Sequence, residues 1–147
     1  MDKKQILKAA IKKEVEAHDL YADMAERTDN PGARSLLEDL AEEEDGHRQL
    51  LEGLSAEEID KFTPPEKRDL KLTEHLKSKP LKENSSLQDV LVHAMEREKR
   101  AREFYETMAQ STDGKTWSTL FGKLAKMENT HKARLEEFYE EVFLQEM

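Results

Sequence analysis

Two stretches of similar sequence decide the fold: residues 40–51 read LAEEEDGHRQLL and residues 124–135 read LAKMENTHKARL. Each contains a Glu-x-x-His pair between leucines; these pairs are Glu44 with His47 and Glu128 with His131. Residues three positions apart share one face of an α-helix, so each pair presents a carboxylate beside an imidazole. The leucines recur at helical spacing on the same face, which predicts that both pairs point into a hydrophobic core.

The helical pattern extends outward from these stretches and predicts an all-α chain. Apolar or small residues recur every three to four positions over four segments, about residues 3–27, 33–54, 86–111 and 116–145. Turn-forming residues separate the members of each pair of segments, at 28–32 and at 111–114. We therefore expect a four-helix bundle of two antiparallel hairpins, covering about residues 3–54 and 85–145.

A crossover of about residues 55–84 joins the hairpins, because Pro64, Pro65 and Pro80 interrupt any helix there. Ser55 can cap one short extra turn, and Ser85 or Ser86 can cap the third helix. We expect Pro31 and Gly32 to belong to the first turn, with the second helix starting at residue 33. All of these elements fit one domain over residues 1–147.

The two hairpins are copies of one another. A shift of 84 residues aligns them without a gap and superposes the pairs Glu14 and Glu98, Tyr21 and Tyr105, Glu44 and Glu128, and His47 and His131. Such an internal duplication predicts two similar hairpins packed about a pseudo-twofold axis.

The register of each hairpin brings these residues to one height. Glu14 is as far from the first turn as Glu44 and His47 are, and Glu98 has the same relation to Glu128 and His131. Packing the hairpins through their apolar faces therefore gathers four carboxylates and two imidazoles in one buried layer. Buried unpaired carboxylates cost several kcal/mol each. Two divalent ions would neutralise four carboxylates, and oxygen with imidazole suits iron or manganese, while zinc also binds such ligands.

At this point a family resemblance is visible. The ungapped pattern Glu-x-x-Ala-x-x-x-Tyr with Glu-x-x-His, present at 14–21 with 44–47 and again at 98–105 with 128–131, resembles the diiron domain of rubrerythrins in the ferritin-like superfamily. The resemblance covers about residues 3–145 and implies a ferritin-like bundle holding two iron ions. It implies that Glu14 and Glu98 are ligands, that Glu44 and Glu128 bridge the metals, and that His47 and His131 are terminal ligands.

The resemblance has two departures. Rubrerythrins carry a further glutamate one turn after the third-helix ligand, where this chain has Ala101, and they usually carry a cysteine-rich rubredoxin domain, whereas this sequence has no cysteine. We therefore expect electrons to come from a separate protein and the chain to resemble the short, stand-alone rubrerythrin-like proteins.

Three functions stay open on the sequence. The first is an oxidoreductase that acts on peroxide or dioxygen in oxidative-stress defence, with no catalytic residue beyond the metal ligands. The second is a ferroxidase or iron-storage protein, and the third is a metal-free helical interaction module. The resemblance also favours a homo-oligomer.

The charge and hydropathy of the chain indicate which classes of partner to expect. The 147 residues include 33 acidic and 24 basic side chains, a net charge of −9, so we expect no nucleic-acid partner. No run approaches the ~20 apolar residues of a membrane span, and the first residues lack the apolar region of a signal peptide. We expect a soluble, cytoplasmic protein with no membrane partner.

Other polar residues near the layer have two interpretations each. Tyr21 and Tyr105 are either core tyrosines or donors of hydrogen bonds that orient ligand carboxylates. His18, one turn after Glu14, is either an extra ligand or proton relay or a residue on the flank of the helix. We expect His75 and His93 to be solvated.

Overall fold

The structure, a computed structural model, describes residues 2–62, 81–111 and 114–144. Its four long helices are α1 (Lys3–Arg27), α2 (Pro31–Glu52), α5 (Leu87–Ser111) and α6 (Lys115–Tyr139). A short helix, α3 (Ala56–Asp60), follows α2, and a π-helical segment, η1 (Glu140–Leu144), extends α6. The described residues contain no strand, which confirms the all-α prediction. The crossover prolines at 64, 65 and 80, and His75, lie outside the described residues.

Short polar side chains cap the starts of α1, α3 and α5. Asp2 and Ser55 each form a capping box, at α1 and α3 respectively. The Ser86 hydroxyl accepts a hydrogen bond from the Asp89 amide at 3.2 Å, as expected for the cap of α5.

The second helix begins two residues earlier than predicted. Asn30 is its N-cap, with its side-chain oxygen accepting from the Ala33 amide at 3.0 Å, and Pro31 is the first helical residue. Proline is tolerated at that position because the amide of the first helical residue has no partner within the helix. The prediction that Pro31 and Gly32 lie in the turn was therefore wrong.

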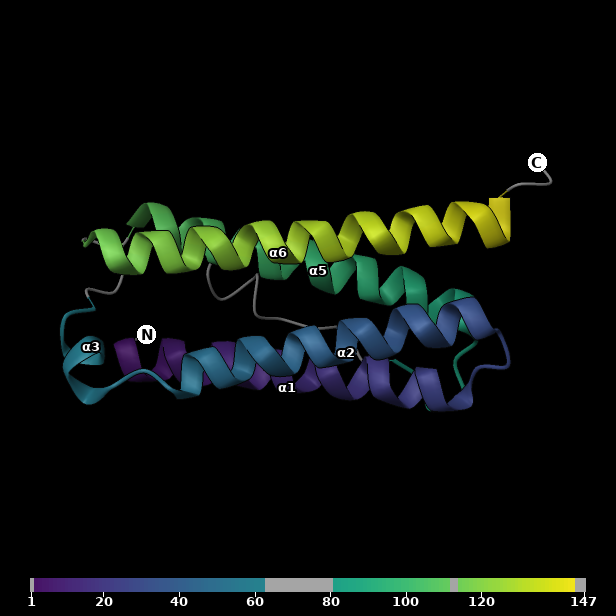
Figure 1. Ribbon diagram of the computed structural model, residues 1–147, viewed down its shortest axis with the longest axis horizontal. Coiled ribbons are helices and arrows are strands. Elements are labelled where there is room, and N and C mark those ends of the chain that lie inside the picture. Colours follow the sequence, from purple (N-terminus) through teal and green to yellow (C-terminus); the bar gives the residue numbers. More distant parts are fainter. Residues whose placement is uncertain (1, 63–80, 112–113, 145–147) are drawn as a thin grey trace.

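The long helices form two antiparallel hairpins, as Figure 1 shows, with α1 on α2 and α5 on α6. The hairpins pack face to face through the contacts of α1 with α5 and of α2 with α6. They point in opposite directions, so that the turn of the first hairpin lies beside the end of α6 (Figure 1). This arrangement confirms the predicted bundle and places equivalent positions of the two hairpins opposite one another.

Two hydrophobic clusters fill the bundle, one toward each end. The first combines the open end of hairpin 1 with the turn end of hairpin 2, and its members include Ile6, Leu7, Leu51, Phe104, Met108, Trp117, Phe121 and Leu124. The second combines the opposite ends, and its members include Met24, Leu37, Leu40, Val90, Leu91 and Leu135. Most positions of one cluster are related to the other by the 84-residue shift, as expected for a pseudo-twofold arrangement. Each fully buried Leu, Phe or Met contributes roughly 1.5–3 kcal/mol.

None of the described helices combines the length and the apolar character that crossing a membrane requires.

Candidate metal centre

A polar layer lies in the interior at mid-height of the helices. It contains all six predicted ligands: Glu14 from α1, Glu44 and His47 from α2, Glu98 from α5, and Glu128 and His131 from α6. None of these residues is more than 3% exposed. The heptad-like apolar spacing of each helix turns the six polar side chains inward together with the leucines on either side.

The six side chains form two overlapping groups whose donor atoms lie within 4.8 Å of one another. One group is Glu14, Glu44, His47 and Glu128, and the other is Glu44, Glu98, Glu128 and His131. The two groups share the carboxylates of Glu44 and Glu128. Such an arrangement has the composition of two adjacent cation sites joined by two common carboxylates.

Each histidine turns its Nδ1 atom toward the layer and approaches the carboxylate of the other hairpin most closely. His47 Nδ1 lies 3.0 Å from Glu128 Oε1, and His131 Nδ1 lies 3.0 Å from Glu44 Oε1. The two imidazole rings are nearly parallel, with an interplanar angle of 8° and centroids 5.7 Å apart. The layer is therefore formed jointly by the two hairpins, and neither hairpin contains it alone.

Many polar atoms of this layer have no hydrogen-bond partner. They are Glu14 Oε2, Glu44 Oε1, Glu98 Oε2, Glu128 Oε1 and both ring nitrogens of His47 and His131. Buried polar atoms in folded proteins are almost always paired. Six of these atoms, the four carboxylate oxygens and the two Nδ1 atoms, belong to the layer itself, and bound cations would pair them. Oxygen and imidazole nitrogen are suitable donors for iron, manganese or zinc, and the residues present therefore fit two divalent ions.

Protons compensate part of the negative charge when no metal is bound. Burial, together with the charges of the neighbouring carboxylates, raises the pKa of Glu44 and of Glu128 well above the ordinary value. Burial lowers the pKa of His47, but its contacts with Glu128 and Glu14 outweigh burial and raise that pKa to about 9. The pKa of His131 is raised in the same way, with contacts to Glu98 outweighing burial. Metal ions would displace these protons.

Two buried tyrosines connect the hairpins at the layer. The Tyr105 hydroxyl donates to Glu14 Oε1 at 2.6 Å, and the Tyr21 hydroxyl donates to Glu98 Oε1. Each tyrosine thus bonds the carboxylate of the other hairpin. Burial, followed by the neighbouring glutamate charge, raises the pKa of both hydroxyls well above the usual value, so both stay protonated donors. Their role in orienting metal ligands is still a prediction.

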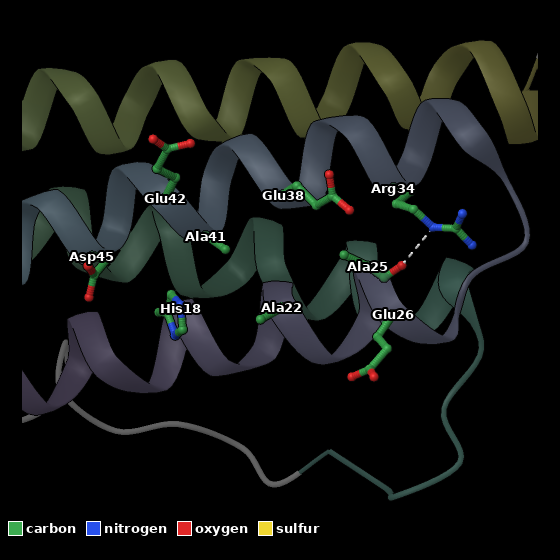
Figure 2. A pocket seen from close by; sticks show the side chains of 9 residues that line it. All are labelled: His18, Ala22, Ala25, Glu26, Arg34, Glu38, Ala41, Glu42 and Asp45. Atoms are coloured by element: carbon green, nitrogen blue, oxygen red, sulfur yellow. Dashed lines mark hydrogen bonds between the residues drawn. The ribbon is translucent and has the colours of Figure 1, made fainter.

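His18 lies outside the polar layer. Its side chain is 39% exposed, and its Nδ1 atom lies 3.0 Å from Asp19 Oδ1. It lines a groove of about 630 Å³ between α1 and α2, together with Glu42 and Asp45. Figure 2 shows His18 on α1 and both acidic residues on α2. Four carboxylates line this groove: Glu26, Glu38, Glu42 and Asp45. The position favours the interpretation of His18 as a helix-flank residue.

The second hairpin has the equivalent groove, of about 480 Å³, between α5 and α6. Arg102 replaces His18 there, and Lys126 replaces Glu42, so the acidic character is confined to the first hairpin.

Two further positions complete the comparison with the sequence. His93 is partly exposed on α5, so the expectation of a solvated histidine is met only in part, and burial followed by Arg97 and Arg100 lowers its pKa. Glu43, which sequence reasoning did not single out, has its Oε1 atom 3.7 Å from the outer nitrogen, Nε2, of His131. The only sequence signal for it is that its counterpart in the repeat, Met127, is uncharged.

Comparisons with known proteins concern the fold and the family of the chain. The chain is similar to the solved structure of a hypothetical protein from Pyrococcus furiosus, with a TM-score of 0.71, 25% identity, and coverage of 95% of this chain and 89% of that one. It is also similar in fold to a Thermotoga maritima protein described as a ferritin-like diiron-carboxylate protein, with a TM-score of 0.68, 23% identity and 93% coverage of both chains. No curated protein matches the sequence. The family model for rubrerythrin matches residues 5–139, and the chain therefore belongs to the rubrerythrin family.

Proposed function

We propose that this protein is a diiron oxidoreductase that reduces hydrogen peroxide or dioxygen with electrons from a separate donor protein. The observation that carries the proposal is the pair of overlapping Glu and His groups, buried to at least 97% and rich in polar atoms without partners. Membership of the rubrerythrin family supports iron as the metal.

In this proposal the six residues have two roles. Glu44 and Glu128, which belong to both groups, would be shared by the two ions, and the remaining glutamate and histidine of each group would complete the ligand set of one ion. When bound, two iron ions supply two redox-active centres and polarise an oxygen substrate. The two histidines bind through Nδ1, the ring atom that faces the layer in the structure.

The chain itself supplies the rest of the chemistry. Tyr21 and Tyr105 hold the carboxylates of Glu98 and Glu14 in place through hydrogen bonds. The hydrophobic clusters above and below the layer exclude bulk water, which strengthens the electrostatic interactions inside it. Protons on Glu44 and Glu128 leave as metal binds, since both carboxyls have raised pKa values without metal.

Iron handling is the second candidate function, and the acidic groove of the first hairpin favours it. The groove carries four carboxylates, and the protein has a net charge of −9, so divalent cations would concentrate at this face. A storage protein would form a large assembly that takes up many irons per chain. A small assembly with two irons per chain would exclude storage.

Metal analysis with matched variants tests the ligand assignment. We expect two metal ions per chain in the wild type, a loss of stoichiometric binding in His47→Ala and Glu128→Ala, and no change in His18→Ala, which removes a histidine whose side chain is 39% exposed. Equal metal content in all four proteins would contradict the assignment.

A reaction with the substrate tests the activity. Anaerobic reconstitution with ferrous iron followed by hydrogen peroxide should produce the near-ultraviolet absorption of an oxidised diiron centre. A loaded protein whose spectrum does not change after peroxide or dioxygen would contradict the oxidoreductase function while leaving the metal site intact.

A further inference from the structure

The two repeats have the same six candidate ligands, but some residues next to these ligands differ between the repeats. The six candidate ligands match across the 84-residue shift, but three neighbouring residues of the His131 side do not: Glu43, Arg134 and Asp39 correspond to Met127, Leu50 and Lys123. One histidine therefore has charged neighbours that the other lacks.

The three unmatched residues form a chain of contacts that leads from His131 toward the surface. Arg134 Nη1 donates to Glu43 Oε2 at 2.8 Å, and Arg134 Nη2 lies 3.5 Å from Asp39 Oδ2. Glu43 therefore lies at the seam between α2 and α6, next to Arg134. Its other carboxylate oxygen, Oε1, lies 3.7 Å from His131 Nε2.

A carboxylate beside His131 Nε2 would give this ring nitrogen a hydrogen-bond partner. The atom is buried and has no hydrogen-bond partner, and Nδ1 of the same ring faces the polar layer. The Glu43 side chain is 42% exposed and can rotate, so the 3.7 Å separation can close to a hydrogen bond. In the part of the chain that the structure describes, His47 Nε2 has no carboxylate oxygen within ion-pair distance.

We propose that Glu43 is a positioning residue that makes the two halves of the metal centre unequal, with the ion on the His131 side held more tightly than the ion on the His47 side. When Nδ1 binds a metal, Nε2 keeps its proton and can donate it to a carboxylate. A carboxylate in that place fixes the ring and strengthens its nitrogen as a ligand, and its removal typically lowers metal affinity about 10- to 100-fold. This inference rests on the dimetal site of the proposed function.

A purely structural role for Glu43 makes a different prediction. If Glu43 only joined the hairpins through Arg134, then Glu43→Met and Arg134→Leu would lower the stability of the fold and change both metal-binding steps alike. If Glu43 acts on His131, Glu43→Met weakens one step selectively. Glu43→Gln keeps an oxygen acceptor at the same place and should restore part of the affinity.

An anaerobic titration with Co²⁺ separates these outcomes. The protein is first freed of metal with a chelator, and binding is monitored by visible absorption and by calorimetry. We expect two unequal steps in the wild type and a tighter step weakened about 10- to 100-fold in Glu43→Met. The mirror variant Met127→Glu with Leu50→Arg places the same two residues beside His47 and should strengthen the weaker step.

Proton NMR of the histidine rings gives a readout that does not depend on metal affinity. In the Zn²⁺-loaded protein, the Nε2 proton of His131 should resonate at low field and exchange slowly, and Glu43→Met should abolish both properties without changing the His47 signal.

Three results would overturn the inference while leaving the proposed function in place: two equal steps in the wild type, a Glu43→Met titration in which both steps weaken alike, or a Glu43→Met titration and ring signal like those of the wild type. A wild type that binds no metal would overturn the proposed function and this inference together.

Discussion

Removing the metal should make the stability of the fold depend on pH in an unusual direction. In the metal-free protein the pKa values of His47, His131, Glu44 and Glu128 are all raised. Between about pH 6.5 and 9 these four groups therefore hold more protons in the folded chain than in the unfolded chain, and their contribution to the free energy of unfolding falls as pH rises.

The size of the effect follows from His47 alone. Its pKa changes from 6.5 in the unfolded chain to about 9 in the folded protein. At ~1.4 kcal/mol per pH unit, this difference corresponds to about 3 kcal/mol of stability. That contribution is fully present below about pH 6.5 and is lost as pH rises through about 9. Against a total stability of roughly 5–15 kcal/mol, the loss is easily measured.

Urea unfolding followed by circular dichroism provides the assay. The chelated wild type should be about 3 kcal/mol less stable near pH 9 than near pH 6.5. His47→Gln should lose much of this dependence, whereas His18→Ala should keep it. If the stability of the chelated protein stayed constant or increased toward pH 9, His47 would not be held protonated by the glutamates and the prediction would be wrong.

Three other predictions concern the stability of the helical bundle around the site. Tyr21→Phe and Tyr105→Phe each remove one hydrogen bond to a buried carboxylate and should each lower the stability of the metal-free protein by roughly 1.5–3 kcal/mol, measured by urea unfolding. Leu40→Ala, at a fully buried position, should cost about 2–5 kcal/mol, whereas Val92→Ala, at a position 47% exposed, should change stability by less than about 0.5 kcal/mol in the same assay. Gly114→Ala should lower the stability of the fold by about 1–3 kcal/mol, because Gly114 has a φ of +110°. Gly46→Ala should raise the stability by about 0.5–1 kcal/mol, since a Cβ added at this helical position meets nothing within 4 Å. Thermal melts of the two variants and the wild type measure both effects.

Local patterns were sufficient to predict the layer. The spacing of Glu44 and His47 fixes their shared face, and the position of the first turn fixes the height of Glu14 relative to them. Because both relations are internal to one hairpin, they did not depend on how the hairpins pack. The duplication then placed Glu98 and its partners at the same height in the second hairpin.

The contacts between hairpins could not be predicted in the same way. Tyr21 lies two turns after Glu14 in the sequence, yet its hydroxyl bonds Glu98 of the other hairpin. Which glutamate it reaches depends on the distance and offset between the hairpins, and these are set by the packing of many side chains. The same limit applies to Glu43, whose neighbour His131 lies on the helix across the seam. The early start of α2 at Pro31 has a local cause, the N-cap at Asn30.

The position of the layer argues that it is kept for function. It separates two hydrophobic clusters whose positions mostly correspond through the 84-residue shift, so apolar side chains in its place would join them into one continuous core. Replacing buried ionic groups with well-packed apolar residues is often neutral or stabilising by about 1–4 kcal/mol. Four glutamates and two histidines that are at most 3% exposed therefore make the metal-free fold less stable than an apolar bundle would be. Ions that bind only the folded chain would restore that stability, so the loaded protein should resist urea better than the chelated one by an amount that grows with free metal concentration.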